Sequence, residues 1–480
     1  MRRFLLAFSV LLLVGCKVGP NYQRPAVPAP DAFRYQPQEA QDTANTAWWE
    51  LFQDPVLDGL IAEALARNQN VQIAAASVEQ AAAVLTQVRS PLFPQLNYGA
   101  SAARVRSSEA NVSPLLKSVM ENPQSSYQIF AGASWEIDLW GRVRRLSEAA
   151  RASLLASEEG RRGAVLSVVA GVAAGYLQLR GLDEQLAVAR KNLASYGEAV
   201  QLFEVQFKHG QVSMMTVQQA RTRYETAAAT IPQIETQIVQ TENALSILLG
   251  RNPSPIARGK SIHDLALPAV PSGLPSQLLE RRPDVAQAEQ NLIAANAQIG
   301  AARALYFPTI SLTGDYGYAS PELSDLFKGA ARTWSYAGSI AGPIFAGGAI
   351  YGQVKEAEAA RRAALGAYEL AIQSAFADVE NALIAHVKLG EQLQAQGRLV
   401  GAASEYARLA QLQYKGGFVP YSTVLQAQEQ LFPDELNYAS VRTALFTSLV
   451  DIYKAMGGGW VLLADGLAAA GEGGAAEAAP

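Results

Sequence analysis

The 480-residue sequence predicts a mixed α+β membrane protein, in which a long antiparallel α-helical coiled-coil barrel adjoins a transmembrane β-barrel shared by several copies of the chain. Three observations support this prediction: an export signal at the N-terminus, an internal duplication of nearly the whole chain, and two kinds of hydrophobic spacing within each half. Helical spacing extends over dozens of residues, whereas strict alternation of apolar and polar residues extends over about ten.

The overall composition argues against nucleic-acid binding. Charged residues make up 17% of the chain, and the formal net charge is −4. Proteins that bind nucleic acid through its phosphates carry a strongly basic surface. We therefore expect no nucleic-acid partner.

The N-terminus has the pattern of an exported lipoprotein. Residues 1–15 form a predicted signal peptide, because two arginines precede an apolar run, Phe4–Val14, that is too short to span a bilayer. The run ends in Leu-Val-Gly-Cys, which resembles the bacterial lipobox, and Cys16 is the only cysteine, so no disulfide is available to it. We predict that Cys16 carries a covalent lipid; the alternative is an ordinary apolar residue of the run. Lys17, in place of aspartate, permits sorting to the outer membrane.

Three segments with little hydrophobic periodicity flank or connect the body. The first is rich in proline and glutamine and indicates an extended, lipid-anchored tether, the second contains five prolines and links two halves, and the third is a flexible tail of glycine, alanine and glutamate. They cover residues 16–53, 251–275 and 459–480.

The body is an internal duplication. Segment Ile61–Leu96 aligns without gaps on Pro275–Ile310, and Phe207–Gly210 corresponds to Tyr414–Gly417. Each half is therefore expected to contain a helix, two membrane strands, a long helix, a tip and a returning helix. The two halves cover residues 54–250 and 276–458.

Apolar residues at three- and four-residue spacing predict a coiled-coil hairpin in each half. Residues 142–207 would form one helix of 66 residues, roughly 99 Å long at 1.5 Å per residue. The pattern breaks at two tips, residues 207–216 and 414–423, and then resumes. Pro232 and Pro433 fall inside the returning helices, where each should produce a local kink.

Four short runs alternate apolar and polar residues, which predicts strands with one apolar face. Each run has the length of a tilted membrane strand, although alternation alone also fits a soluble sandwich. An open sheet of four strands would leave unpaired backbone groups in hydrocarbon, so other copies must close it, giving 8, 12 or 16 strands for two, three or four copies. The runs cover about residues 95–105, 125–137, 309–319 and 333–341.

The sequence contains no recognisable catalytic constellation. Its three histidines, His209, His263 and His386, fall in no metal-binding or nucleophile motif. Glycines at short spacing lie where a predicted strand ends and a helix begins, and helix capping explains them better than phosphate binding does. We expect no enzyme activity, no metal and no cofactor other than the lipid on Cys16.

Several motifs together resemble the TolC family. More narrowly, they resemble its lipoprotein branch, the OprM- and NodT-type outer-membrane components of tripartite drug-efflux systems. The resemblance covers nearly the whole mature chain and includes its duplicated plan. The motifs are the lipobox and the segments Gly19–Pro25, Glu280–Val285, Phe307–Leu312 and Met456–Trp460.

The resemblance implies a homotrimer with a 12-stranded β-barrel and a 12-helix periplasmic tunnel, in which Asp54–Ser90 and Ser276–Ala304 are the shorter upper helices. It implies two partners, a periplasmic adaptor (membrane fusion) protein and an inner-membrane pump, commonly of the RND type. The adaptor is expected at the two helical tips, where small glycines would let another backbone approach, or would serve only the hairpin turn. The tip residues concerned are Gly210, Val212, Gly417 and Val419.

At the closed end of the tunnel the sequence departs from the family. The relatives carry an inward ring of aspartates on the final helix and a nearby tyrosine that helps to hold the aperture shut. Tyr414 matches the tyrosine, but Thr423 and Gln426 stand at the aspartate positions. We therefore expect an aperture lined by Gln426 amides. Glu429, on about the same helix face, is the nearest acidic candidate, or else a solvated surface charge.

The leading functional hypothesis is passive conduction, across the outer membrane, of drugs or other small solutes that a partner pump delivers. The main rival is a structural lipoprotein that spaces or tethers the envelope layers. An exit duct for a type I secretion pump is a further alternative, and a hydrolase is a distant third. The sequence does not name the exported compound, because a passive duct has no substrate pocket.

Overall fold

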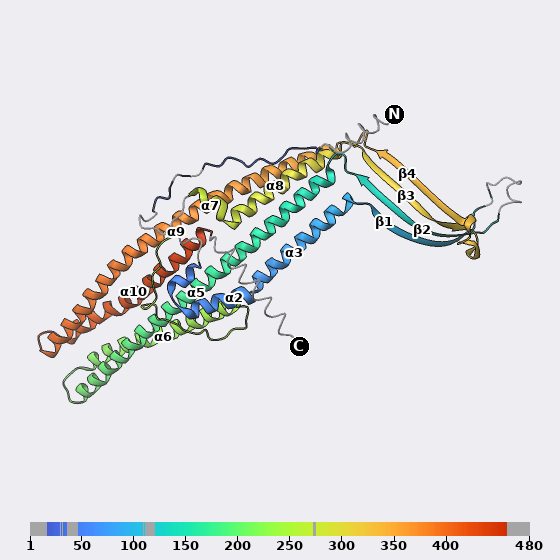
Figure 1. Ribbon diagram of the computed structural model, residues 1–480. Coiled ribbons are helices and arrows are strands. Elements are labelled where there is room, and N and C mark those ends of the chain that lie inside the picture. The colour runs from blue at the N-terminus through green and yellow to red at the C-terminus, as the bar shows by residue number, and fades with distance from the viewer. Residues whose placement is uncertain are drawn as a thin grey trace. The chain divides into compact units, whose positions relative to one another are not determined.

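The computed structural model describes residues 17–28, 30, 32–35, 47–108, 110, 121–271 and 275–457, and Figure 1 shows the course of the chain. The predicted signal peptide, Cys16 and the predicted C-terminal tail lie outside the described residues. The chain divides into two compact units, and each half of the sequence contributes to both. The first unit comprises the described residues within 1–26, 78–156 and 288–368, and the second comprises those within 27–77, 157–287 and 369–480.

The first unit contains an antiparallel sheet of four strands in the order β1-β2-β3-β4 (Figure 1). Strands β1 and β2 come from the first half of the sequence and β3 and β4 from the second, so the pairing of β2 with β3 joins the two halves. β1 and β4 form the edges of the sheet. The strands are β1 (Gln95–Val105), β2 (Gln124–Ile137), β3 (Thr309–Ser320) and β4 (Arg332–Ala341).

The register of the strands separates an apolar face from a polar face. Side chains of successive residues point to opposite faces of a sheet, so each row of paired residues belongs to one face. One row on the apolar face consists of Tyr98, Ala131, Tyr316 and Trp334. The adjoining row on the polar face consists of Asn97, Gly132, Asp315 and Ser335.

The helices repeat in length between the two halves, as a duplication requires. Helices α5 and α9 have 67 residues each, and the returning helices α6 and α10 have 35 residues each. Within the described ranges the α-helices are α2 (Pro55–Arg67), α3 (Gln69–Arg89), α5 (Arg142–Lys208), α6 (Met214–Leu248), α7 (Pro275–Arg281), α8 (Pro283–Ala304), α9 (Ala349–Lys415) and α10 (Tyr421–Ala455).

The shorter upper helices are each divided in two, which the sequence analysis did not anticipate. The expected helix of the first half is α2 and α3, and that of the second half is α7 and α8. The breaks fall at Asn68 and Arg282, which are equivalent positions of the duplication. Asn68 Oδ1 accepts the N–H groups of Asn70 and Val71 at 2.8 and 3.2 Å, and Pro283, which has no N–H, begins α8.

The two break residues make equivalent contacts with the returning helices. Asn68 Nδ2 donates a hydrogen bond of 2.7 Å to the carbonyl of Leu248, the last residue of α6. Arg282 Nη1 donates one of 3.2 Å to the carbonyl of Ala455, the last residue of α10. Each contact satisfies a carbonyl that the end of a helix leaves without an intrahelical partner.

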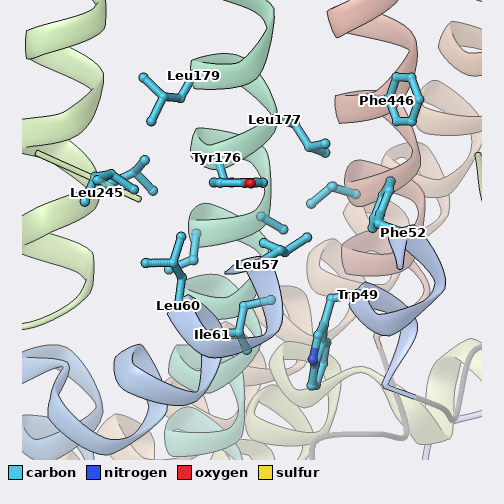
Figure 2. Packing of buried hydrophobic residues seen from close by; sticks show 14 of the residues in the cluster. Trp49, Phe52, Leu57, Leu60, Ile61, Tyr176, Leu177, Leu179, Leu245 and Phe446 are labelled. Atoms are coloured by element: carbon cyan, nitrogen blue, oxygen red, sulfur yellow. The ribbon is translucent and has the colours of Figure 1, made fainter. Parts of the chain in front are cut away.

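A large apolar cluster forms the core of the second unit (Figure 2). Trp48, in the 3-10 helix η1 (Trp48–Phe52), is fully buried and stacks on the ring of Tyr453 with 5.0 Å between centroids. Tyr176 and Leu177 of α5 lie in the same cluster. An 18-residue window of α5 has a mean hydropathy of 1.5, high enough for a membrane span, but 67% of that window is buried within the protein. Packing inside the protein therefore accounts for the apolar character of α5.

In the first hairpin, the apolar residues at three- and four-residue spacing form a seam that lies mainly in its interior. Helices α6 and α10 continue through Pro232 and Pro433, whose side chains are exposed, and a kink at either proline stays a prediction. The buried seam residues of the first hairpin are Ala189, Tyr196, Phe203, Val217, Ala220, Ala227, Ile234, Ile238 and Leu245.

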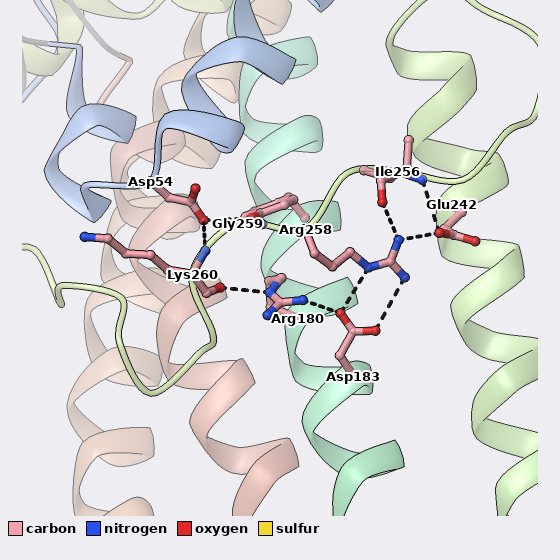
Figure 3. Close-up of polar contacts among 9 residues, drawn as sticks. Asp54, Arg180, Asp183, Glu242, Ile256, Arg258, Gly259 and Lys260 are labelled. Atoms are coloured by element: carbon pink, nitrogen blue, oxygen red, sulfur yellow. Dashed lines mark hydrogen bonds and ion pairs between the residues drawn. The ribbon is translucent and has the colours of Figure 1, made fainter.

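A polar network fixes the segment after α6 to the helices of the second unit (Figure 3). Arg258 Nε lies 3.1 Å from Asp183 Oδ2 on α5, and its Nη1 also pairs with Glu242 on α6. Asp54, fully buried at the start of α2, accepts a 3.1 Å hydrogen bond from the backbone N–H of Lys260. Since a buried charge is costly without partners, these contacts explain why carboxylates are tolerated beside the core.

Candidate functional site

The predicted tip and aperture residues gather at the two helix tips, which belong to the same unit. The first tip joins α5 to α6 through residues 209–213, and the second joins α9 to α10 through residues 416–420. The four helix ends pack into one apolar cluster, in which the rings of Phe203 and Tyr421 lie 4.1 Å apart between centroids. This tip cluster holds the two turns next to each other. It consists of Phe203, Val217, Ala220, Ala410, Tyr421, Val424, Leu425 and Ala427.

Gly210 and Gly417 occupy equivalent positions in the two turns. Their φ angles are +71° and +74°, in the left-handed region that favours glycine. In both turns the glycine N–H donates to the carbonyl three residues earlier, and the following N–H donates to the carbonyl five residues before it, each at 2.9 Å. This pattern is the Schellman motif, which usually places glycine at this point. The turn alone therefore explains both glycines, so they do not by themselves indicate docking.

The surface around the tips is open and bears exposed apolar side chains. A Cβ atom built on either tip glycine would meet no atom within 4 Å. Phe418 is 84% exposed in the second turn, and Met215 is 68% exposed at the start of α6. Val212 packs partly on the tip cluster, and Val419 is half-buried. Sequence reasoning selected the two valines and missed Phe418 and Met215, although an apolar side chain inside a turn was a visible signal.

The predicted aperture residues differ in their burial. Tyr414, near the end of α9, is half-buried, and its ring centroid lies 5.2 Å from that of Tyr421. On α10, Thr423 is half-buried and Gln426 is exposed. Of these two polar side chains, Gln426 is therefore the more exposed.

Glu429 is neither an isolated surface charge nor a free carboxylate. Its Oε2 lies 2.5 Å from Arg223 Nη2, so the pair joins α10 to α6. The Arg223 guanidinium holds the pKa of the Glu429 carboxyl below its usual value. Because the carboxylate side chain is 62% exposed, the pair contributes little to stability, but it does neutralise the charge of Glu429. Sequence reasoning missed Arg223, which lies more than two hundred residues away in the chain.

The predicted tether is not extended throughout: residues 17–26 belong to the first unit, whereas its end, Trp48–Phe52, is the buried 3-10 helix η1 in the core of the second unit. Arg145 of α5 is almost fully buried and donates to the carbonyls of Val18 and Gly19 at 3.0 and 2.9 Å. The backbone of Lys17 lies against Gly141, between β2 and α5. Cys16 itself lies outside the described residues, but its neighbour is held where a strand meets a helix.

Comparison with known proteins gives a consistent result. Residues 60–251 and 274–458 match the family model described as outer membrane efflux protein. The solvent efflux pump outer membrane protein SrpC of Pseudomonas putida is 38% identical over 461 residues, which cover 94% of this chain and 97% of that protein. The cation efflux system protein CusC of Escherichia coli is 34% identical over 465 residues, 95% of this chain and 98% of that protein.

Solved structures share the fold over nearly the whole chain. The open state of the Neisseria gonorrhoeae MtrE outer membrane channel is 34% identical with a TM-score of 0.83, and the match covers 93% of this chain and 99% of that one. The outer-membrane channel OprN is 29% identical with a TM-score of 0.86 and coverage of 93% and 100%. These structures support the described fold of both units.

The left-handed conformation at Gly417 can be tested with two substitutions. Gly417→Val should loosen the turn, because a side chain in this conformation costs about 1–2 kcal/mol. Gly417→Asn should be tolerated, since asparagine adopts left-handed φ more readily. Limited proteolysis should cut the second turn of the Val variant faster than that of the parent and of the Asn variant. Equal cutting rates in all three proteins would show that the backbone does not require glycine here.

Proposed function

The chain belongs to the outer membrane efflux protein family, and we propose that it is the outer-membrane channel subunit of a tripartite efflux system. In this role it passively conducts drugs or other small solutes to the outside of the cell. The observation that carries the proposal is the sheet with one apolar and one polar face, joined in the sequence to helices of 67 residues. Strands of this kind suit a membrane barrel, and the conduction itself requires no catalytic group.

We propose a homotrimer as the working assembly. Each chain offers four strands with two free edges, and three chains would close a barrel of 12 strands. The coiled-coil hairpins of three chains would likewise form a continuous helical barrel in the periplasm. The resemblance to the TolC family supports this number of copies.

Conductance in a planar bilayer tests the proposed function. Purified protein should form discrete, stable channels, because a closed barrel with a polar interior is filled with water. Mass measurement of the same preparation in detergent should give three chains per particle. A trimer without conductance would favour the structural envelope lipoprotein, and a monomer with a stable strand signal would contradict the architecture.

We propose that the two tips receive the periplasmic adaptor, which in turn contacts an inner-membrane pump of the RND type. The apolar side chains exposed around the tip cluster support this proposal, because an exposed apolar patch commonly marks a protein interaction site. Both turns are held side by side by the tip cluster, so one adaptor surface can meet them together.

Substitution of Phe418 tests the docking proposal. Phe418→Glu should weaken capture of the adaptor at least several-fold, because a charge would replace an exposed apolar contact. Phe327→Glu is the matched control, since Phe327 is 70% exposed and lies between β3 and β4. Crosslinking to the purified adaptor would measure the effect. Similar capture by both trimeric variants would argue against docking at the tips.

We propose that the periplasmic aperture is lined by uncharged Gln426 side chains. The exposure of Gln426 on α10 and the pairing of Glu429 with Arg223 both support an aperture without free carboxylates. Closure then involves little repulsion between like charges. A pair of carboxylates 8 Å apart would repel each other by about 2 kcal/mol at an effective dielectric of 20.

Introduction of a carboxylate tests the neutral aperture. Gln426→Asp should create block by divalent cations, whereas the parent channel should show only weak block in single-channel recordings. Glu429→Gln serves as the control, since it removes a carboxylate that is already paired. Strong divalent block in the parent that persists in the Glu429→Gln variant would contradict the proposed aperture.

We propose that Cys16 carries the lipid anchor and that the protein resides in the outer membrane with a large periplasmic portion. Cys16→Ala should abolish labelling by a fatty-acid probe, because the thiol is the only one in the chain. The variant should remain membrane-associated through its barrel, since one lipid anchor adds less affinity than a spanning structure. Labelling that persists in the variant would refute the assignment.

A further inference from the structure

The polar face of the sheet bears very few charges. Its residues are the odd-numbered positions of β1, β3 and β4 and the even-numbered positions of β2, as the register defines them. No lysine or arginine occupies these positions, and the only ionisable side chains on them are Glu136 and Asp315. In a barrel, this face lines the lumen, because the apolar face meets lipid.

Glu136 and Asp315 differ in their surroundings. Glu136 lies at the helical end of β2, and both of its carboxylate oxygens lie 3.0 Å from Arg142 Nη2. Asp315 lies mid-strand in β3, is exposed, and has no ion pair with any residue in the described part of the chain. Its carboxylate accepts a 3.3 Å hydrogen bond from Ser335 Oγ. Within the described residues, no cationic side chain supplies its countercharge, so mobile cations can do so.

The row that contains Asp315 concentrates oxygen atoms on the lumen side. Gly132, which lies between Asn97 and Asp315 in the row, has no side chain. A Cβ atom built on it would lie 2.4 Å from Asn97 Oδ1 and 2.8 Å from Asp315 Oδ1. The two side chains therefore converge over β2 from opposite neighbouring strands. A carboxylate, an amide oxygen and a hydroxyl thus lie together in one row.

The next row towards the end of the sheet remote from the helices is apolar at its centre. Phe130 pairs with Gly99 and Gly317. A Cβ atom built on Gly99 would lie 2.8 Å from the ring of Phe130. The ring thus lies over β1, next to the row that contains Asn97 and Asp315, and Phe130 is 40% exposed. An aromatic ring therefore lies on the polar face in the row next to that of Asp315.

We propose that Asp315 is the charge-selecting residue of the channel and that it favours cations over anions. The inference rests on the proposed function, because it needs three copies of the row to form a ring of three carboxylates around the lumen. A ring of unpaired carboxylates around a pore with low-dielectric walls raises the local concentration of cations. Asn97 and Ser335 supply further oxygen atoms with which a passing cation can replace part of its hydration.

This assignment places charge selection in the strands rather than at the helix tips. At the tips, Glu429, the acidic candidate for the aperture, is paired with Arg223. In the sheet, no described cation neutralises Asp315. The channel therefore selects charge at a fixed, strand-built ring, whichever state the tips adopt.

Reversal potentials of reconstituted trimers under a potassium chloride gradient test the proposal. The parent should prefer potassium to chloride, Asp315→Asn should lower the permeability ratio several-fold, and Asp315→Lys should invert it. Asp315→Glu should retain the preference, and Asn97→Asp should strengthen it by adding a carboxylate to the same row. Asp325→Asn is the matched control, because it removes a carboxylate that Lys328 already pairs in the loop after β3.

The outcomes separate this inference from the proposed function. A conducting trimer whose permeability ratio is unchanged in Asp315→Asn, or changed equally by Asp325→Asn, overturns the assignment of Asp315 alone. A parent protein that forms no channel overturns the proposed function together with this inference. A several-fold loss in Asp315→Asn with retention in Asp315→Glu supports the ring.

Discussion

Two free strand edges constrain the whole protein. β1 and β4 expose unpaired N–H and C=O groups at either side of a sheet whose one face is apolar across all four strands. In hydrocarbon each such group costs several kcal/mol, so a single chain cannot place this sheet in a membrane. The same chain carries helices of 67 residues whose apolar positions are buried largely within its own hairpins. The sheet is therefore the part of the structure that requires further copies of the chain.

The two halves of the duplication cap equivalent helix ends with different side chains. Both upper helices break at the same position, but Asn68 caps the following helix with its side chain, whereas Arg282 precedes a proline that needs no cap. Both residues nevertheless donate to the carbonyl that ends a returning helix. The turns at Gly210 and Gly417 have the same hydrogen bonds. Backbone requirements are therefore shared between the halves, while the side chains that meet them have diverged.

Carboxylates of the second unit are paired beside the core and near the tips, whereas Asp315 on the sheet has no ion pair among the described residues. Arg258 pairs with two carboxylates beside the core, and Arg223 pairs with Glu429 near the tips. The pairs of Arg258 keep partly buried carboxylates from destabilising the packed helices, whereas the exposed pair of Arg223 and Glu429 contributes little to stability. Asp315 has no such partner among the described residues, which suits a water-filled lumen in which mobile ions supply the countercharge. The distribution of charges thus separates a packed scaffold from a conducting surface.

The sequence by itself determined the strands, the long helices and the tips of this protein, because periodicity is a local property, but it did not predict the breaks in the upper helices at Asn68 and Arg282. Alternation located four strands within about one residue of their ends, and helical spacing located both long helices and both tips. Side-chain partners far apart in the chain were decided only by tertiary structure. Glu429 meets Arg223, and Asn97 meets Asp315 over Gly132, through strand register and hairpin packing that no local pattern encodes. The sequence therefore predicted where the tips lie, whereas the fold decided which charges near them are paired and which carboxylate on the sheet remains free.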